Sequence, residues 1–566
     1  MKRVVLVGIN AKYTHTNLAI RSLAKYAGRP QVQLVEYSIN QPLEQVAQDL
    51  AEQKAHIYGF STYIWNISYI RALAEKMPGK VLLGGPEASS SPEECLLFSD
   101  YVIRGEGEEA FRIFMDKLEA GEDVLETPSL CYRSQSGAFV ENPPAPAVDL
   151  AKLPQPYEQP EHLGGKIIYY ESSRGCPFAC AYCLSSLSGG VRFAPVEKVK
   201  KDLDVFIAAG VGKVKFVDRT FNADRRRAQE IFRYVMERGG KTDFHFEIEA
   251  DLLDEATCKL LSKARPGQIQ LEIGVQSTHL PTLQAVCRAQ DFSYTAKMVR
   301  ALAAGKNLHL HLDLIAGLPL EGMKEFCRSI DDVMQLGAEK VQLGFLKVLK
   351  GSKMRELAGK YGICFSKNPP YEVRSTAHLS AAELQALHQV EYLLERTYNA
   401  GLFRQVVQYF GGRIGYARFY LELREQFERE GAALLGLTEL QLAQALLRFC
   451  RERQDAVAEQ MLLLDLLLKK RRPRLPAELE QKREWKRAFY RSFPDGQLQS
   501  LPRAKRPWHF SRLEEFSFDV CAYLRSGALQ GQPGRYLFDY TANRVRNLQT
   551  GEQMSFWSAF PLPPSG

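Results

Sequence analysis

Three cysteines, Cys176, Cys180 and Cys183, stand close together in the stretch RGCPFACAYC at residues 174–183. They follow the apolar run at 167–170, which is typical of a strand. The C-x-x-x-C-x-x-C spacing brings three thiolates together from one short loop. A closed four-iron cluster takes four cysteines, so three ligands leave one iron open to a substrate or cofactor. The spacing therefore predicts a reactive iron–sulfur site.

A zinc site and three buried thiols are the alternatives for these cysteines. Zinc sites usually combine two C-x-x-C or Cys/His clusters, and the chain has no second pair. The eight other cysteines stand alone in the sequence, and an isolated cysteine is more often a small buried apolar residue than a metal ligand. The motif and its context favour the iron–sulfur cluster.

Length and composition are those of a soluble protein with several domains. The chain has 566 residues, of which 45% are hydrophobic and 25% charged, as in ordinary globular proteins. No apolar run approaches the ~20 residues of a membrane-spanning helix, and the longest, at 461–468, contains Asp465. The short apolar run after Lys2 and Arg3 predicts a first strand rather than a signal peptide. We expect a cytoplasmic protein whose eleven cysteines are thiols or metal ligands.

Residues 1–120 alternate short β-rich runs with amphipathic helical stretches. Strands are expected at 4–8, 33–37, 56–61, 81–84 and 100–104. This alternation predicts a doubly wound parallel sheet, and such sheets bind ligands at the carboxyl ends of their strands. A hairpin is expected near 134–137, followed at 143–160 by a proline-rich, semi-rigid linker.

A second series of strands and helices covers residues 165–350. Its strands are expected at 167–171, 213–217, 244–249, 268–274, 309–315 and 341–345. In α/β barrels the chemistry lies at the carboxyl-terminal rim, and the three cysteines follow the first of these strands. Beyond residue 375 the periodicity becomes helical, at 380–397 and 438–468, with one further strand expected at 535–540.

The cysteine motif, with the aromatic Tyr182 before its last cysteine, resembles that of the radical S-adenosylmethionine (SAM) enzymes. The resemblance implies that the three cysteines hold a [4Fe-4S] cluster whose fourth iron binds SAM. It also implies that reduction of the cluster by an external flavodoxin or ferredoxin cleaves SAM to a 5′-deoxyadenosyl radical. The six strand–helix units are similar to the open partial (βα)6 barrel of that superfamily.

The same resemblance indicates residues that contact SAM. Residues 272–277 resemble the E-x-G-x-Q-S element of these enzymes, and residues 313–321 resemble the fifth-strand element that packs against adenine. The implied SAM-contacting residues are Tyr182, Asp218, Glu272, Gln276 and Gly317. Asp218 stands where the family often has a G-G-E-like triplet, which is absent here, and a helix cap or turn residue is its alternative role. Glu249 stands where many relatives carry an arginine, which leaves the SAM carboxylate to Arg219 or another basic residue.

The first domain resembles the cobalamin-binding domain of the B12-dependent radical SAM class. The resemblance lies in the loops after its strands, whose glycines allow the backbone to approach a large flat ligand. The implied cobalamin-contacting residues are Asn10, Tyr13, His15, Ser61, Tyr63, Gly84, Gly85, Glu87, Gly105 and Glu106. A domain that binds nothing is the alternative.

The D-x-H-x-x-G motif of B12-dependent mutases is absent from this first domain. Tyr13 and Leu18 stand where that motif has its aspartate and its glycine. The sequence therefore does not identify the lower ligand of cobalt. His15 is one candidate, and a loop histidine that only forms a hydrogen bond with the backbone is the other interpretation.

Residues 469–512 carry fourteen Lys or Arg residues and four acidic residues, with aromatic residues among them. This composition is compatible with binding RNA or another anionic partner. A solvated surface, or one packed on the barrel, is the alternative. Over nearly its full length the chain resembles a branch of the class that has a C-terminal domain of unknown function, DUF4080, and no assigned substrate.

We therefore expect an α/β protein with a Rossmann-like, doubly wound cobalamin-binding domain at 1–142 and a linker at 143–164. A radical SAM partial barrel at 165–370 and a mostly helical, DUF4080-like region at 371–566 complete it. The resemblance implies that the enzyme uses a [4Fe-4S] cluster, SAM and cobalamin to methylate an unactivated carbon of an unknown small-molecule or RNA substrate. One alternative is a radical rearrangement or cyclisation with cobalamin as redox partner. Another is an iron–sulfur RNA-binding or sensor protein without turnover.

Overall fold

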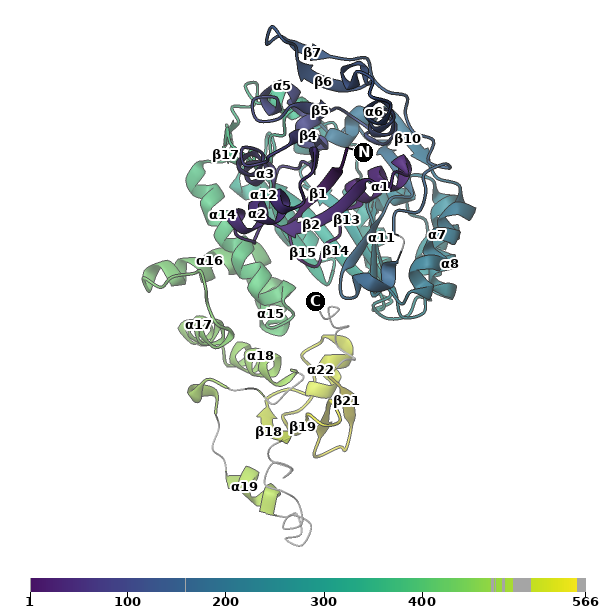
Figure 1. Cartoon of the computed structure of the whole chain (residues 1–566). Helices are drawn as coiled ribbons and strands as arrows, with labels where there is room; N and C mark the ends of the chain where they lie inside the picture. The colour runs from purple at the N-terminus through teal and green to yellow at the C-terminus, as the bar shows by residue number, and fades with distance from the viewer. Residues whose placement is uncertain are drawn as a thin grey trace. The chain divides into compact units, whose positions relative to one another are not determined.

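The structure is a computed structural model that describes residues 2–157, 159–469, 473, 475–480, 484–491 and 510–556 (Figure 1). The chain divides into two compact units. The first contains the described residues up to Leu302, together with Ile315–Gly322 and Gly344–Ser380. The second contains Ala303–Leu314, Met323–Leu343 and the described residues from Ala381 onward. Within the described part of the chain, no helix is long and apolar enough to cross a membrane.

The first unit begins with a seven-stranded sheet in the order β2-β1-β3-β4-β5-β6-β7. Its parallel strands are β1 (Val4–Asn10), β2 (Val32–Ser38), β3 (Ile57–Ser61), β4 (Lys80–Gly84) and β5 (Tyr101–Ile103). These confirm the five predicted strands. The expected hairpin is formed by the antiparallel strands β6 (Leu130–Arg133) and β7 (Phe139–Glu141).

Helices cover both faces of this sheet. The side chains of β1 alternate, so that Val4 and Leu6 pack with α1 (Leu18–Ala27) and α6 (Glu108–Ala120). Val5 and Val7 pack with α2 (Leu43–Glu52) and α3 (Ile67–Ala74) on the opposite face (Figure 1). The predicted doubly wound fold is therefore confirmed. The chain leaves β1 toward β2 on one side and toward β3 on the other, so the carboxyl ends of β1 and β3 form the switch point where such folds bind ligands.

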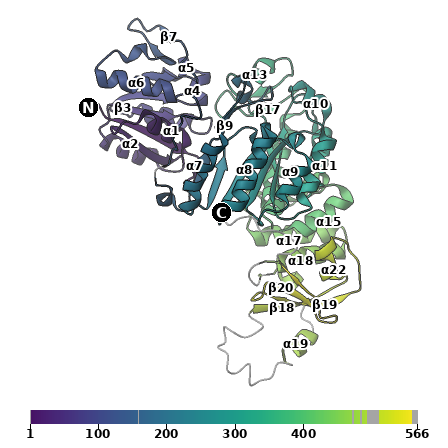
Figure 2. The same cartoon turned by 90° about the vertical axis from the view of Figure 1, so that its right-hand side faces the viewer.

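A second sheet has the order β15-β14-β13-β12-β11-β8, with β8 and β15 at its two edges. The strands are β8 (Ile167–Tyr170), β11 (Lys213–Phe216), β12 (Asp243–Ile248), β13 (Ile269–Gln276), β14 (His309–Ala316) and β15 (Lys340–Phe345). The intervening helices are α7 (Val196–Ala208), α8 (Arg225–Arg238), α9 (Glu255–Leu261), α10 (Leu280–Ala285), α11 (Phe292–Ala303) and α12 (Met323–Met334) (Figure 2). All six predicted strands are present, and the sheet is open, as expected.

Strand β13 shows how this sheet presents polar groups on one face. Its residues alternate strictly between buried and half-buried. Leu271 and Ile273 are fully buried on one face, whereas Glu272 and Gln276 lie on the other. The predicted strand at 268–274 therefore extends further, to Gln276. It carries both Glu272 and Gln276 of the E-x-G-x-Q-S element.

The second unit contains the helices α14 (Ala381–Leu394), α15 (Arg404–Ile414), α16 (Tyr416–Arg429), α17 (Glu439–Glu452) and α18 (Ala456–Leu467). The helix expected over 438–468 is two helices. Thr438 caps α17 in a capping box, and Asp455 caps α18. Residues Met461–Leu467 of α18 are all buried, so this apolar run belongs to a core helix.

The described chain ends with an antiparallel sheet of β18 (Ser511–Phe516), β19 (Gly534–Asp539), β20 (Arg544–Asn547) and β21 (Gln553–Ser555). Only β19 corresponds to a predicted strand. Much of the basic segment 469–512 lies outside the described residues. Within its described part, Lys486 pairs with Glu514 (2.6 Å) and Arg512 pairs with Glu480 (3.2 Å).

Candidate cluster and cofactor site

The three cysteines lie on and beside a small hairpin that follows β8. Strand β9 (Ser173–Cys176) pairs antiparallel with β10 (Gly190–Phe193), and Cys176 stands opposite Gly190. Cys180 and Cys183 lie in the connecting loop, where the Cys183 amide donates to the Cys180 carbonyl (3.1 Å). The sequence-based expectation contains no such hairpin, because both strands are short and each contains a glycine.

Two neighbouring segments hold the middle of the cysteine loop. The Ala181 amide donates to the Val286 carbonyl (2.9 Å), and the Met354 amide donates to the Ala181 carbonyl (2.8 Å). The Cys176 Sγ lies 3.3 Å from the Thr220 Oγ1. Burial raises the pKa of the Cys180 thiol, and the nearby Arg288 opposes that rise.

The donor set fits an iron–sulfur cluster better than a single metal ion. Among the described residues, the one trio of His, Cys, Asp or Glu whose ligand atoms all lie within 4.8 Å of one another is Asp519, Cys521 and Glu552. At least one pair of the three loop sulfurs is therefore further apart than 4.8 Å. A tetrahedral zinc ion with bonds of about 2.3 Å holds its sulfurs about 4 Å apart. A cluster attaches each cysteine to a different iron, which suits a wider spacing.

A buried arginine that the motif analysis did not single out lies beside this loop. The Arg288 Nη1 lies 3.7 Å from the Cys180 Sγ, and its Nη2 forms an ion pair with the Glu249 Oε2 at 2.6 Å. Nη2 also donates to the Gly274 carbonyl. Burial raises the pKa of Glu249, and Arg288 opposes that rise. Arg288 is thus a basic residue that lies beside Glu249, and no sequence motif marks it.

Gln276 belongs to the same cluster of side chains. A Cβ atom on Gly274 would lie 2.2 Å from the Gln276 Nε2 and 3.7 Å from the Arg288 Nη2. The Gln276 amide therefore lies against Gly274, whose carbonyl accepts from Arg288. Gln276 has a positive φ of 69°. The structure brings Gln276, Glu249 and Arg288 together beside Cys180.

Asp218 is fully buried behind the cysteine hairpin. Its Oδ1 accepts from the Ser172 amide at 2.7 Å, and its Oδ2 accepts from the Ser172 hydroxyl. Arg227, which is also buried, donates to the Ser172 carbonyl (2.9 Å). Burial raises the pKa of Asp218 to about 6. These bonds hold Ser172, the residue that precedes β9. Asp218 therefore supports the hairpin from behind.

Glu272 takes part in a chain of charges on the polar face of the second sheet. Its Oε2 lies 3.1 Å from the Lys215 Nζ and 2.8 Å from the His245 Nε2. Lys215 also approaches Glu247 at 3.5 Å. Burial lowers the pKa of His245, which favours the neutral imidazole beside Glu272. The arrangement offers two carboxylates and one ammonium group to a polar ligand.

Gly317 and Tyr182 complete the residues for which SAM contact is expected. Gly317 has a φ of +84°, and a Cβ there would lie 2.7 Å from Val373. The close approach of Val373 therefore requires glycine at this turn. Burial raises the pKa of Tyr182, which precedes Cys183 directly.

A cavity of about 1070 Å³ opens within the first unit, at the switch point of the first sheet. It is at the upper end of the size range of small-molecule sites. Six of the ten residues implied in cobalamin contact line it: Asn10, His15, Tyr63, Gly85, Gly105 and Glu106. Arg174, Gly175 and Leu184 of the cysteine hairpin and its loop line the same cavity, as does Arg219. Its size and its glycine-containing rim fit a corrin.

An aromatic pair also lines this cavity. The rings of Tyr63 and Trp65 stack with their centroids 4.3 Å apart and their planes 8° from parallel. His15 packs edge-on against Tyr169, with the ring centroids 5.6 Å apart. Burial and the nearby Lys12 lower the pKa of His15. Both effects favour the neutral form of the His15 ring.

The other four residues implied in cobalamin contact do not line the cavity. The Ser61 Oγ accepts from the Asn17 amide group (2.9 Å), and Gly84 accepts from the Thr62 amide (2.7 Å). Tyr13 is 76% exposed, and Lys166 lies over its ring. Glu87 is buried and accepts from the Tyr371 hydroxyl. Ser61 and Gly84 thus support the loops of the switch point rather than its surface.

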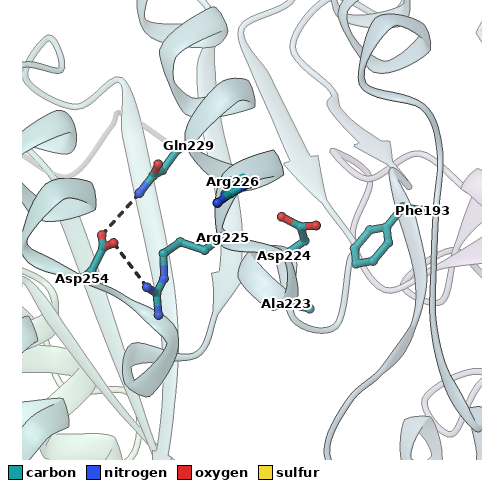
Figure 3. A pocket seen from close by; sticks show the side chains of 7 residues that line it. All are labelled: Phe193, Ala223, Asp224, Arg225, Arg226, Gln229 and Asp254. Atoms are coloured by element: carbon teal, nitrogen blue, oxygen red, sulfur yellow. Dashed lines mark hydrogen bonds and ion pairs between the residues drawn. The ribbon is translucent and has the colours of Figure 1, made fainter.

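A second pocket of about 600 Å³ lies at the start of α8 (Figure 3). Its residues pair among themselves: Arg225 and Gln229 both approach the Asp254 carboxylate, at 3.4 and 3.3 Å. Asp224 caps α8 by accepting from the Arg227 amide. Phe193 lines the opposite side. None of the residues implied in SAM or cobalamin contact lines this pocket.

The chain matches three known families in succession. Residues 4–115 match the B12 binding domain, residues 170–333 match the radical SAM superfamily, and residues 359–538 match a protein family of unknown function, DUF4080. These matches cover both cofactor regions and the C-terminal region expected from the sequence.

Two curated relatives that match over most of their length are named as methyltransferases. The chain is 24% identical to 2-(S-pantetheinyl)-carbapenam-3-carboxylate methyltransferase of Streptantibioticus cattleyicolor. It is 23% identical to the cobalamin-dependent radical SAM methyltransferase TokK of Streptomyces tokunonensis. Each match covers 78% of this chain and 72% of the relative.

Solved structures share the fold. The cobalamin-dependent SAM radical enzyme OxsB, with aqua-cobalamin and SAM bound, matches with a TM-score of 0.59 and 15% identity. That match covers 82% of this chain and 78% of OxsB. The radical SAM methyltransferase TsrM of Kitasatospora setae matches with a TM-score of 0.55 and 16% identity, over 66% of this chain and 80% of TsrM.

Proposed function

The chain belongs to the cobalamin-dependent radical SAM enzymes, with a DUF4080 region at its C-terminus, and we propose that it transfers a methyl group to an unactivated carbon of a small molecule. The cofactors of this class are a [4Fe-4S] cluster, SAM and cobalamin. Methyl transfer is supported by the similarity to relatives that are methyltransferases.

One observation carries the proposal. A single cavity of the first unit is lined both by loops of the B12 binding domain and by the hairpin of Cys176. A reaction that uses cobalamin and a SAM-derived radical requires both groups to reach one substrate. A cavity shared by Gly85, Gly105, Arg174 and Gly175 meets that requirement.

The residues of the chain would hold and orient these groups. Cys176, Cys180 and Cys183 would hold the cluster, and Tyr182, Glu272, Gln276 and Gly317 would contact SAM. When bound, the cluster and SAM supply a radical that abstracts hydrogen, and cobalamin supplies the methyl group. Asp218 would act on the site through Ser172, because both of its oxygens accept from that residue.

The charged face of the second sheet, which includes the proposed SAM contact Glu272, would also bind polar groups of the substrate. Lys215, Glu247 and Glu272 are each about a quarter exposed there. Two carboxylates beside one ammonium group favour a substrate with hydrogen-bond donors or a cationic group over a polyphosphate. Lys486 and Arg512 of the basic segment 469–512 pair with acids, so these two residues give no support to an RNA substrate.

The electron would come from a flavodoxin or ferredoxin, in the cytoplasm. None of the eleven cysteines is in a disulfide, which is compatible with a reducing compartment.

Anaerobic reconstitution with iron, sulfide and hydroxocobalamin, followed by desalting, tests the proposal. We expect about four irons and one corrin to remain per chain, and incubation with SAM and a strong reductant to yield S-adenosylhomocysteine with 5′-deoxyadenosine. 5′-Deoxyadenosine alone would indicate a radical rearrangement or cyclisation instead. A protein that retains no corrin, or that leaves SAM intact, would overturn the proposal.

A further inference from the structure

We propose that Arg174 is a positioning residue that clasps the hairpin of Cys176 to the cavity loop Gly105–Glu108, and so sets the placement of the cluster relative to the cobalamin. The inference rests on the proposed function for the identity of the two groups. The clasp itself consists only of side chains of the first unit: Arg174, Arg192, Glu106, Glu108 and Glu171.

Arg174 binds three carboxylates at once. Its two terminal nitrogens form a fork with Glu108, at 2.8 and 3.2 Å. Nη1 also lies 3.1 Å from Glu106, and Nη2 lies 2.6 Å from Glu171. A two-pronged contact of this kind fixes orientation as well as distance, which a lysine cannot do.

The pair of Arg174 and Glu108 within the clasp is largely shielded from water. The side chains of Arg174 and Glu108 are only 18% and 7% exposed. Burial alone would raise the pKa of Glu108, but the charge and hydrogen bonds of Arg174 lower it overall. Ion pairs on an open surface contribute little, whereas removal of one partner of a buried pair leaves an uncompensated charge.

The pairing of β9 with β10 requires these acids. Arg192 of β10 stands directly opposite Arg174 of β9, and like charges opposite each other destabilise an antiparallel pair. Glu106 relieves this repulsion, because it pairs with both Arg192 and Arg174. Arg192 also donates to the Val148 carbonyl in the proline-rich linker (2.7 Å). The hairpin is therefore complete only when the cavity loop is in place.

The clasp residues lie close in sequence both to the first cysteine of the cluster and to the loop of the proposed cobalamin site. Arg174 lies two residues before Cys176 on the same strand. Glu106 and Glu108 flank Gly107, and Glu108 begins α6. Of the five clasp residues, all except Arg192 line the shared cavity. A shift of the loop on ligand binding would thus move the strand that carries the first cysteine.

The test compares Arg174→Gln with a matched control, Arg112→Gln. Arg112 pairs with Glu109 and Asp116 on α6, and it takes no part in the clasp. The first measurement is hydrogen exchange of the full chain, without added cofactors. We expect Arg174→Gln to accelerate exchange roughly tenfold or more in two separate peptides, one at 101–111 and one at 173–193. The control should leave both unchanged. Acceleration in neither peptide, or in only one, would contradict the proposal that Arg174 joins the hairpin to the cavity loop.

The second measurement tests the distance between the cluster and the cobalamin. In reconstituted protein, the reduced cluster shortens the electron-spin relaxation time of cob(II)alamin by an amount that depends on the distance between them. We expect Arg174→Gln to change this shortening at unchanged iron and corrin content, and Arg174→Lys to restore it only in part. An unchanged value would mean that Arg174 stabilises the fold without positioning the groups.

Glu106→Gln keeps the test decisive if Arg174→Gln fails to fold. It removes one carboxylate and leaves Arg174 paired with Glu108 and Glu171, and we expect the same two effects at smaller size. A wild-type protein that binds no corrin would overturn the proposed function, whereas the exchange measurement would still decide the clasp.

Discussion

The guanidinium group of Arg288 lies 3.7 Å from the sulfur of Cys180, and Glu249 holds it there from the other side at 2.6 Å. Both side chains of the ion pair are buried, with 8% of each exposed. A positive charge and a hydrogen-bond donor at a ligand sulfur are among the features that set the reduction potential of an iron–sulfur cluster. The contact therefore links a residue outside the cysteine motif to the chemistry of the site.

Replacement of Arg288 should make the cluster harder to reduce. In Arg288→Gln we expect a more negative reduction potential, because the reduced cluster carries an extra negative charge that Arg288 stabilises. A redox titration followed by electron paramagnetic resonance measures it. Arg265→Gln, which breaks an exposed pair with Asp243, is the control. Equal potentials in wild type and Arg288→Gln would contradict this role.

Cys180→Ala should abolish the cluster. Removal of one of three ligands should lower the iron content of the reconstituted protein to near zero and stop SAM cleavage. Cys287→Ala is the matched control, because Cys287 is exposed and follows Val286, which contacts the same loop. We expect this control to keep its iron. Loss of iron in Cys287→Ala as well would indicate a fourth cysteine ligand.

Asp218→Asn should act on stability and cluster content rather than on SAM binding. An amide keeps one acceptor, but it cannot accept from both the Ser172 amide and the Ser172 hydroxyl as the carboxylate does. The loss of one buried hydrogen bond should cost about 1–3 kcal/mol. Thermal unfolding and iron analysis measure these effects. A several-fold rise in the KM for SAM at an unchanged melting temperature would instead place Asp218 in contact with SAM.

Gly85→Ala and Gly105→Ala form a matched pair that tests the cavity. Both glycines line it and both have positive φ values. A Cβ on Gly85 would lie 2.6 Å from the Thr62 carbonyl, whereas a Cβ on Gly105 meets no atom within 4 Å. We expect Gly85→Ala to displace the start of α4 (Pro86–Ser90) and reduce corrin retention strongly, and Gly105→Ala to reduce it less. The ratio of bound corrin to protein after desalting measures both. Equal retention would argue against a corrin at this loop.

Asp465 should make the stability of the second unit depend on pH. Its carboxylate accepts from the Gln405 and Val406 amides, at 2.9 and 3.0 Å, at the start of α15. Burial raises its pKa to about 8, from 3.8. The folded state therefore keeps the proton to higher pH than the unfolded state does. This contribution to the free energy of unfolding is complete below pH 3.8 and is lost as the pH rises to about 8, by up to about 1.4 kcal/mol per pH unit.

Asp465→Asn should remove this pH dependence of the free energy of unfolding. Denaturant unfolding of the full chain at several pH values between about 5 and 8 compares the two proteins. We expect the variant to lose stability at low pH, since an amide replaces a two-oxygen acceptor with one oxygen, and to gain on the wild type as the pH rises. Parallel pH profiles would show that Asp465 does not titrate in this range.

The strand–helix alternation and the cysteine spacing were predictable because they are local. A buried parallel strand needs a short apolar run, and a three-cysteine loop needs only its spacing, so all eleven predicted strands of the two parallel sheets are present in the structure. The hairpin of β9 and β10 was not predictable in this way. Its strands contain glycines and two facing arginines, and acids some 70 residues away offset those charges.

Which side chains meet at the site was decided by long-range packing. Arg288 lies 108 residues from Cys180 along the chain. The contact between them could not be predicted from the sequence, because an arginine has no characteristic spacing from its partner. Ser61 ends β3 and Glu87 lies at the start of α4. Glu87 is buried against Tyr371, and Ser61 accepts from Asn17. Short-range patterns determine where a loop occurs, whereas the direction of each side chain depends on the neighbours that only the folded chain supplies.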